Sequence, residues 1–344
     1  MKRNVRAGSR RNPLIAAILG AIAALALLAP AGATGATVVN GSFETGTLAG
    51  WQVVNSSESG NWFAYSGTTP PIGEGPVPAP PVGVFAAISA QDGPGTHVLY
   101  QDVALEPGFK HQLSMFVYYK SAANLVTPSP NTLSSGFPPP NQQYRVDVMK
   151  PTAPLESVAP GDILATVFAT QTGGPLEMAP TVLTTDLTPF AGQTVRLRLV
   201  EVDNQLFLWG GADGIAIQST PPPPSNVAVV GKAVLNKKNG TAKLPVTLPG
   251  AGVLSAVDAN FVTVAGISAK KKKRMVKSAT VTATAPGILN VPLKPTGPGR
   301  KVLNEKGKLK IRVALTFTPT GGTAATQTVK VTLKKKLKPK PKKG

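Results

Sequence analysis

The 344-residue sequence predicts an all-β protein made of two β-sandwiches. Short stretches in which apolar and polar residues alternate recur along the chain, and clusters of Gly, Pro and Asn separate them. No segment of the first 220 residues keeps a helical spacing of apolar residues. The chain has 35 glycines, 34 prolines and no cysteine. We therefore expect many turns, and a fold stabilised by burial or a bound ion rather than by disulfides.

The first 36 residues have the layout of a secretory signal peptide. Five basic residues come first, an apolar run of 16 residues covers 14–29, and Ala31-Gly32-Ala33 and Thr34-Gly35-Ala36 offer two cleavage sites. This run is short for a membrane span, which needs about 20 apolar residues. We expect an extracellular or envelope-associated protein with no transmembrane segment in the mature chain. An uncleaved N-terminal anchor is the alternative.

Charge divides the remaining chain into two parts. Residues 37–224 carry 6 basic and 14 acidic residues, whereas residues 225–344 carry 25 basic and 2 acidic residues. The change falls at four consecutive prolines, 221–224, which favour an extended spacer. The domains we expect are a jelly roll over 37–218, a Pro-rich linker over 219–226, a basic domain over 227–333 and a disordered Lys-rich tail over 334–344.

Four strands are clearest in the first domain. Residues 98–105 lead into a turn at Pro107-Gly108, and the strands 112–120, 144–148 and 195–199 follow. Alternate residues of these strands are apolar, as in antiparallel sheets with one solvent-facing side. Repeated short strands of this kind predict a sandwich.

Several motifs of this domain occur in the order found in a known family. They are Asn40-Gly41-Ser42-Phe43-Glu44 with Gly50-Trp51, Gln101-Asp102-Val103, Gln112-Leu113-Ser114-Met115-Phe116, Val195 to Leu199, and Asp213-Gly214-Ile215-Ala216-Ile217. With this order over residues 38–218, the domain resembles the galactose-binding-like jelly rolls of carbohydrate-binding modules of families 4, 9, 16 and 22. The resemblance implies a jelly-roll β-sandwich. It also implies a non-catalytic protein that binds a polysaccharide or a cell-envelope glycan, although such a fold supports many functions.

The same resemblance implies a structural Ca²⁺ ion. In that family the opening Glu and the closing Asp lie together on the terminal strands and help to hold the ion, and they correspond here to Glu44 and Asp213. Calcium prefers six to eight hard oxygen ligands. The sequence departs from the family at Gly214, where relatives often have Asp or Asn. The alternative is that Glu44 and Asp213 are ordinary surface carboxylates.

Sugar recognition needs exposed aromatic rings and planar polar side chains, because rings stack on sugar faces while amides, carboxylates and guanidinium groups bond hydroxyls. The candidate ligand-binding residues are Trp62, Tyr65, Tyr118, Gln143, Arg145 and Asp147. The last three share the polar face of one predicted strand, which could line a binding site or be only its solvated side. An exposed Trp62 beside Arg145 would favour sugar binding, and burial of both would favour a structural role.

The sequence does not predict an enzyme. Residues 201–206, Glu-Val-Asp-Asn-Gln-Leu, approach the Glu-x-Asp-x-x-Glu motif of a glucanase family, but Leu206 replaces the last carboxylate, the general acid/base of that arrangement. His97 and His111 lack metal-ligand spacing. No Gly-x-Ser-x-Gly elbow or phosphate-binding glycine loop is present. A non-catalytic accessory module of a glycoside hydrolase remains an alternative.

The second domain also predicts β-structure. Apolar or alternating runs cover 227–235, 242–248, 275–283 and 289–293, and a hairpin joins 309–317 to 326–333. In its general composition and strand pattern, rather than in any single motif, the domain resembles the Lys-rich immunoglobulin-like sandwiches of secreted actinobacterial-type proteins. The resemblance implies a second β-sandwich.

Positive charge predicts an anionic partner for this second domain. A basic run covers 270–274 and a basic tail covers 334–343. Outside a cell such runs attract wall polymers, acidic polysaccharides and lipid headgroups. We expect no specific nucleic-acid binding, because no recognition fold accompanies the charge. Two alternatives stay open: the lysines only protect sheet edges, or the protein is a structural or adhesive envelope protein without sugar specificity.

Overall fold

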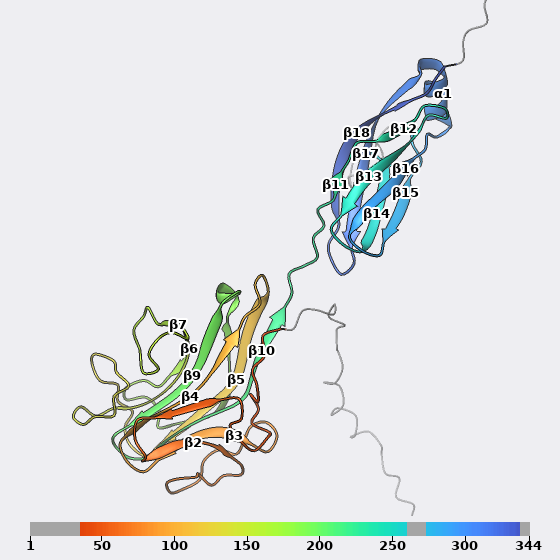
Figure 1. Cartoon of the computed structure of the whole chain (residues 1–344). Coiled ribbons are helices and arrows are strands. Elements are labelled where there is room, and N and C mark those ends of the chain that lie inside the picture. The colour runs from red at the N-terminus through yellow and green to blue at the C-terminus, as the bar shows by residue number, and fades with distance from the viewer. Residues whose placement is uncertain (1–34, 260–272, 338–344) are drawn as a thin grey trace, which may run out of the picture. The chain divides into compact units, whose positions relative to one another are not determined.

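The computed structural model describes residues 35–259 and 273–337. The chain divides into two compact units, 1–221 and 222–344, and the division falls inside the predicted proline spacer. Both units are built almost entirely of antiparallel strands (Figure 1), which confirms the all-β class. Residues 1–34 of the predicted signal peptide, most of the basic run 270–274 and the tail beyond 337 lie outside the described residues.

The first unit is a sandwich of two five-stranded sheets. One sheet has the order β1-β4-β9-β6-β7 and the other has the order β2-β3-β10-β5-β8. The elements are β1 Gln52–Asn55, β2 Gly60–Tyr65, β3 Ala86–Gln91, β4 Gly95–Ala104, β5 Lys110–Ser121, β6 Gln142–Met149, β7 Ile163–Ala169, β8 Glu177–Asp186, η1 Thr188–Phe190, β9 Thr194–Asp203 and β10 Leu208–Thr220. We call these two sheets the β4 sheet and the β5 sheet.

The core of the first unit lies between the β4 and β5 sheets. Alternate apolar residues of each strand point inward, and Phe43 and Trp51 fill one end, with ring centroids 5.7 Å apart. Ala36 is also buried, and its amide donates to Ser219 Oγ over 3.1 Å. Ala36, the last residue of the predicted signal peptide, is therefore part of the packed core of this unit.

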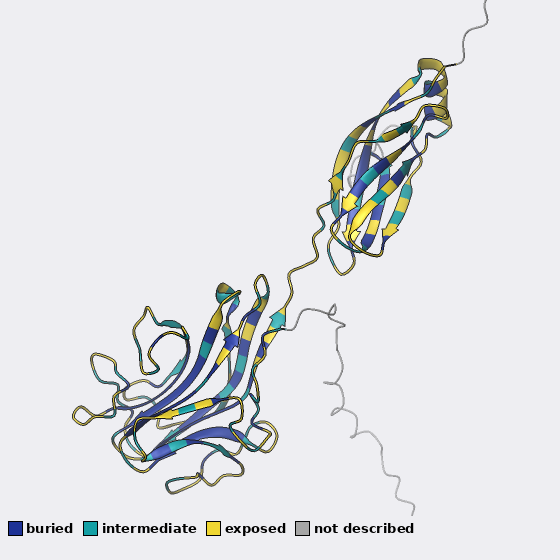
Figure 2. Cartoon of the chain, in the orientation of Figure 1, coloured by how far each residue is buried: buried dark blue, intermediate teal, exposed yellow. Residues whose placement is uncertain are grey.

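Long loops cover the outer faces of both sheets. Segment 66–85 packs on the β5 sheet through Val77, and segment 122–141 packs on the β4 sheet through Leu133. As a result, β3 and β6 are buried at every position. Figure 2 shows many buried residues on the strands of this unit and exposed residues mostly on its loops. The prediction of a solvent-facing side for 144–148 is therefore wrong. The alternation of polarity is real, but covering loops remove the alternation of exposure.

The second unit is a sandwich of two four-stranded sheets. In one, β13 pairs with β11, β12 and β16, and the other has the order β15-β14-β17-β18. The elements are β11 Val229–Val230, β12 Val234–Asn236, β13 Thr241–Leu248, β14 Gly252–Asp258, β15 Ala279–Ala283, β16 Gly287–Leu293, α1 Gly297–Lys306, β17 Lys308–Pro319 and β18 Ala325–Lys334. Inward residues such as Leu244, Leu254 and Phe317 form its own core.

Helix α1 was not predicted, although the local signals for it are present. Thr296 is the N-cap and accepts a hydrogen bond from the Gly299 amide, Pro298 lies in the first turn, and Gly307 ends the helix. Ten residues are too few to show a clear helical period. In the described part of the chain, no helix has the length and apolarity needed to cross a membrane.

The last strand extends beyond the end predicted for the second domain. Strand β18 continues to Lys334, and the next two residues are also held by main-chain hydrogen bonds. The Lys335 amide donates to Gly307 O over 2.8 Å, and the Lys336 amide donates to Lys237 O over 2.9 Å. These bonds tie the end of β18 to α1 and to the turn after β12.

Candidate functional site

Trp62 is a core residue, so the prediction that its ring is exposed and stacks on a sugar is wrong. It lies on β2 and is only 2% exposed, because it points between the two sheets. Its ring lies 6.2 Å from the ring of Tyr144, and its Nε1 donates to His97 O over 3.0 Å. A ring held in this way has no free face for a sugar.

Tyr65 and Tyr118 are also buried, on the outer face of the β5 sheet beneath segment 66–85. The two hydroxyl groups are hydrogen-bonded to each other at 2.7 Å, and Tyr65 donates to Pro78 O over 2.6 Å. Burial raises the pKa of Tyr65 to about 12. The pair holds the covering loop on the sheet, so the prediction that these rings are exposed is wrong.

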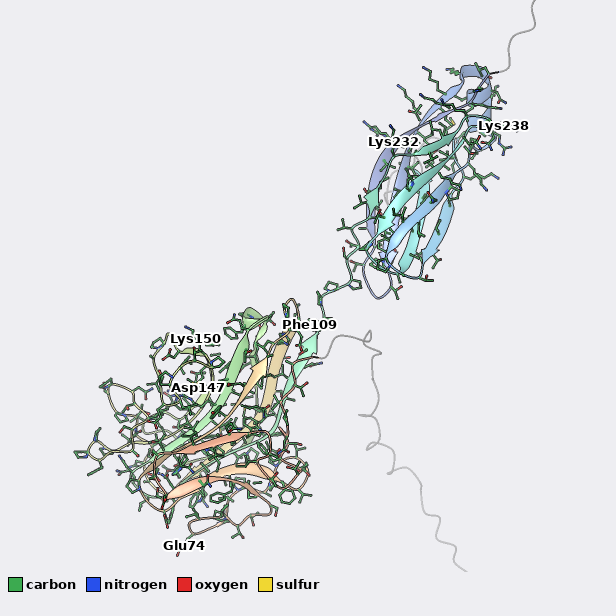
Figure 3. The ribbon with its side chains drawn as sticks, viewed as in Figure 1. Glu74, Phe109, Asp147, Lys150, Lys232 and Lys238 are labelled. Atoms are coloured by element: carbon green, nitrogen blue, oxygen red, sulfur yellow. The ribbon has the colours of Figure 1, made fainter. Side chains whose placement is uncertain are left out.

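The structure brings Arg145 and Asp147 together, but inside an ion network rather than on a solvated face. The Asp147 carboxylate accepts hydrogen bonds from Arg145 Nη2 at 3.0 Å, Arg198 Nη2 at 2.6 Å and Thr166 Oγ1 at 3.0 Å. Asp147, labelled in Figure 3, and Arg198 are both fully buried. Gln143 is buried as well, and its Nε2 donates to Asn141 Oδ1 over 2.7 Å.

This ion network fastens a loop to the sheet. Arg198 Nη1 donates to the main-chain oxygens of Leu155 and Ser157, which belong to the segment between β6 and β7. Burial lowers the pKa of Arg198, and the charge of Asp147 opposes that change. Breaking a buried pair leaves an uncompensated charge in a low-dielectric interior. Arg145, Asp147 and Arg198 are therefore structural residues in this conformation.

A smaller patch of the same outer face stays accessible at the β1 side of the β4 sheet. Arg196 forms a bidentate pair with Asp102, with Nε–Oδ1 and Nη2–Oδ2 distances of 2.7 and 2.8 Å. Its guanidinium carbon lies 4.4 Å from the centroid of the Tyr100 ring. Gln52 of β1 lies opposite Tyr100 in the strand register and is exposed. The Asp102 side chain keeps 36% of its surface exposed.

We call Gln52, Tyr100, Asp102 and Arg196 the β4 patch. It combines an aromatic ring with an amide, a carboxylate and a guanidinium group, which are the groups that bond hydroxyl-bearing ligands. The sequence analysis missed it, although the signal was present. Tyr100 and Asp102 are alternate residues on one side of the predicted strand 98–105, and Arg196 lies on the polar side of 195–199.

Glu44 and Asp213 come together at segment 82–85. Asp213 Oδ2 accepts the Val82 amide at 3.0 Å, and Glu44 Oε1 accepts the amides of Val84 and Phe85, each at 2.9 Å. Burial, followed by the nearby negative charge of Glu44, raises the pKa of Asp213 to about 6. Two adjacent carboxylates that repel each other suit a cation, because its charge would favour both ionised forms.

The surroundings of this carboxylate pair limit the ligands that a cation could find. Within the described ranges, no three His, Cys, Asp or Glu side chains gather in a way that could hold a metal ion. Main-chain oxygens would have to complete the set, which calcium accepts. Gly214 has a φ of 58° at the bulge between Asp213 and Ala216. Gly, Asn and Asp tolerate this left-handed conformation best, so the departure from the family keeps the backbone shape and loses one side-chain ligand.

The carboxylates of the near-glucanase motif point into the core. Glu201 is fully buried and Asp203 is 4% exposed. Burial, then the charge of Asp203, raises the pKa of Glu201 well above its ordinary value. Burial likewise raises the pKa of Asp203 to about 6. Both side chains lie between the sheets, where they contribute to the interior rather than to an open cleft.

Comparison with known proteins finds only remote similarity to solved structures. No family model matches it, and no curated protein matches it. Similar solved structures include a carbohydrate-binding module, TmCBM61, in complex with β-1,4-galactotriose. That module has a TM-score of 0.34 and 13% identity, and the match covers 53% of this chain and 97% of that one.

Two adhesin domains are similar to the same low degree. The K3 cleaved adhesin domain of Lys-gingipain from Porphyromonas gingivalis has a TM-score of 0.33 and 15% identity, over 53% of this chain and 98% of that one. The adhesin domain of Epf from Streptococcus pyogenes has a TM-score of 0.26 and 10% identity, over 89% and 98%. Scores of this size carry no conclusion about ligands.

Proposed function

We propose that the protein is a secreted, non-catalytic binding protein of the cell envelope, and that its second unit attaches to an anionic polymer. The observation that carries this proposal is the charge of that unit. Its described residues include 18 basic and only 2 acidic side chains. A field of this sign attracts polyanions and concentrates them at the surface.

Retention of the mature full-length chain on an immobilised polyanion tests this attachment. We expect saturable binding at 50 mM salt that weakens steeply towards 500 mM, because each neutralised charge releases a counterion. An immobilised neutral polysaccharide is the control. Equal retention on both supports, or no dependence on salt, would remove the electrostatic attachment.

We further propose that the first unit binds a glycan through the β4 patch. The support for this is the set of Tyr100, Asp102 and Arg196 on an outer sheet face, where Asp102 is exposed and the other two are partly exposed. The test is binding to a panel of soluble and insoluble polysaccharides, with calcium and with chelator. Tyr100→Ala should weaken binding about two- to tenfold, since ring contacts contribute on the order of 0.5–1.5 kcal/mol. Phe137→Ala removes an aromatic side chain that is 65% exposed outside the patch, and it is the matched control.

A structural or adhesive protein without sugar specificity is the second candidate. Burial of both Trp62 and Arg145 favours it, because the residues first expected to contact sugar serve the fold instead. The polysaccharide panel separates the candidates. If folded protein binds no glycan of the panel while it still binds the polyanion, the structural role stands and the glycan site is withdrawn.

We also propose that Glu44 and Asp213 hold a structural calcium ion. Their convergence on segment 82–85 and the raised pKa of Asp213 support this proposal. When bound, the ion would supply positive charge that joins the first turn of the unit to its last strand. The residues themselves already join these elements through main-chain amides.

A further inference from the structure

The second unit contains a cavity of about 540 Å³ at the end where α1 lies. Four of its lining side chains are cationic: Lys238, Lys294, Arg300 and Lys335. No acidic residue lines it. Figure 3 marks Lys238 at this end of the unit. We call this cavity the basic pocket.

Three separate segments build the basic pocket and hold it in shape. Lys238 lies in the turn between β12 and β13, where Asn236 Oδ1 accepts the Lys238 amide at 3.1 Å and the Gly240 amide donates to Asn236 O over 2.9 Å. Gly240 has a φ of 75°, and a Cβ there would lie 2.9 Å from Leu303 of α1. The turn therefore packs closely on the helix, and only glycine allows this approach.

Helix α1 and the end of β18 provide the remaining cations. Arg300 and Asn304 are four residues apart, and so they lie on one face of α1. Lys335 donates its Nζ to Asn304 Oδ1 and is fixed by its own main-chain bond to Gly307. Lys294 directly follows β16. Within the described residues, none of the four cationic side chains forms an ion pair.

A second group of basic residues lies on the outer face of β17 and β18, close in sequence to Lys335 of the pocket. Lys308 pairs directly with Lys334, and Arg312 pairs directly with Lys330. All four side chains are exposed. Like charges placed opposite each other on two strands destabilise a sheet. Edge protection accounts for lysines on β18, which is an edge strand, but not for those on β17, which lies between β14 and β18.

We propose that the basic pocket binds a phosphate group of a linear polymer in which phosphates alternate with hydroxyl-bearing units. This inference rests on the proposed attachment of the second unit and locates its site. Lysine and arginine residues from three segments line the pocket, and their side chains are the donors that a tetrahedral oxyanion with several acceptors requires. The volume exceeds that of one phosphate and lies in the range of small-ligand sites. Thr241 and Asn304 also line the pocket. Their side chains would hydrogen-bond the hydroxyl groups of the polymer.

The exposed pairs on β17 and β18 would hold the next repeats of the same polymer. Outward residues of a strand follow one another at about 7 Å. Lys308, Lys310 and Arg312 therefore present one cation at each such step along β17. A polymer with one charge per repeat can follow this line after its first phosphate enters the pocket.

The experiment compares two charge-matched variants of the mature full-length chain. Lys294→Gln with Arg300→Gln removes two cations from the basic pocket. Lys232→Gln with Lys243→Gln removes two exposed cations that do not line it. Binding of poly(glycerol phosphate) at 150 mM salt is measured by calorimetry, and circular dichroism checks the fold of each variant.

We expect the pocket variant to lose about tenfold or more in affinity, because charge-assisted bonds are lost, and the control to lose no more than about threefold. Equal losses would overturn the pocket and leave diffuse attraction. Binding of polygalacturonate as tight as that of poly(glycerol phosphate) would overturn the assignment to phosphate. If the unaltered chain binds neither polymer, the proposed attachment itself fails, and that outcome is distinct from failure of the pocket alone.

Discussion

The two units use charge in opposite ways. In the first unit, Asp147, Glu201, Asp203 and Asp213 are buried, and three of the six basic residues that the structure describes there form ion pairs. In the second unit Asp258 is the one charged side chain among the buried described residues, and the cations lie on the surface. Charge is thus part of the interior of the first unit, whereas the second unit carries it as an external feature.

Charge in the first unit therefore belongs to the folded interior, whereas charge in the second unit is available for binding. A buried charge must be paired or it destabilises the fold. An exposed unpaired lysine costs the fold little, and like-charged pairs even oppose it slightly. Removal of a paired buried charge should therefore destabilise the first unit, removal of an unpaired buried charge should stabilise it, and removal of a surface charge should change the stability of the second unit little.

The largest effect should follow from breaking the buried network. Arg198→Ala leaves the Asp147 carboxylate without its closest partner and frees the segment between β6 and β7. We expect a loss of about 3–5 kcal/mol in the free energy of unfolding. Tryptophan fluorescence during urea unfolding measures it cleanly, because Trp51, Trp62 and Trp209 all lie in the first unit.

Arg196→Ala is the matched control, because it removes an arginine from a partly exposed pair on the same strand. Solvent reaches Asp102, whose side chain is 36% exposed, so we expect a smaller loss than for Arg198→Ala. Equal losses for Arg196→Ala and Arg198→Ala would show that burial does not distinguish the two pairs. The contrast between the units would then lose its main support.

The next effect concerns pH. The folded pKa of Asp203 is raised from 3.8 to about 6, so the folded state binds its proton more tightly than the unfolded state does. The stabilisation from Asp203 is complete below about pH 4 and is lost as the pH rises through 6. Asp203→Asn should therefore raise the free energy of unfolding at pH 8, by at most about 3 kcal/mol.

Urea unfolding of both proteins at pH 4, 6 and 8, followed by tryptophan fluorescence, measures this effect. The difference between Asp203→Asn and the unaltered chain should grow with pH. A difference that is constant from pH 4 to 8 would mean that the Asp203 carboxyl group titrates alike in the folded and unfolded states. Glu201→Gln should act in the same direction, since burial also raises its pKa.

Calcium should give an effect of similar size, and again in the first unit only. At a calcium concentration about 100 times the dissociation constant, binding adds about 2.7 kcal/mol to the free energy of unfolding. Asp213→Asn should abolish the calcium-dependent rise in Tm measured by tryptophan fluorescence. Asp186→Asn, at an exposed carboxylate, should keep it. A rise that persists in Asp213→Asn would place the ion elsewhere.

The sequence predicted the strands better than it predicted what covers them. Alternation located β4, β5, β6 and β9 to within a few residues, because inward residues of a sandwich must be apolar. The loops that bury Tyr65 and Tyr118 from outside, or fasten Arg198, have no periodic signal. The exposure of a polar residue on a strand therefore could not be read from the strand alone.

The candidate sites also differ in how far the sequence alone can predict them. Glu44 and Asp213 were found because a family resemblance joins the two ends of the domain. Tyr100 and Arg196 could have been found by applying the same alternation to neighbouring strands. The basic pocket could not, because Lys238, Arg300 and Lys335 belong to a turn, an unpredicted helix and the end of a strand. Only the fold brings them together.

The smallest effect tests the second unit directly. Lys308→Gln removes one of two like charges that face each other across β17 and β18. We expect the free energy of unfolding of this unit to rise by about 0.2–0.5 kcal/mol, because the cross-strand repulsion is relieved. Scanning calorimetry at low salt can follow the transition of this unit, which lacks tryptophan and tyrosine.

High salt should reduce the gain from Lys308→Gln, since screening already weakens the repulsion. Thr328→Val, at an uncharged outward position of the same strand pair, is the control and should show no salt dependence. A loss of stability in Lys308→Gln would mean that this lysine supports the fold. The lysines of β17 would then need no ligand to account for them, and the contrast between an internal and an external use of charge would have to be confined to the basic pocket.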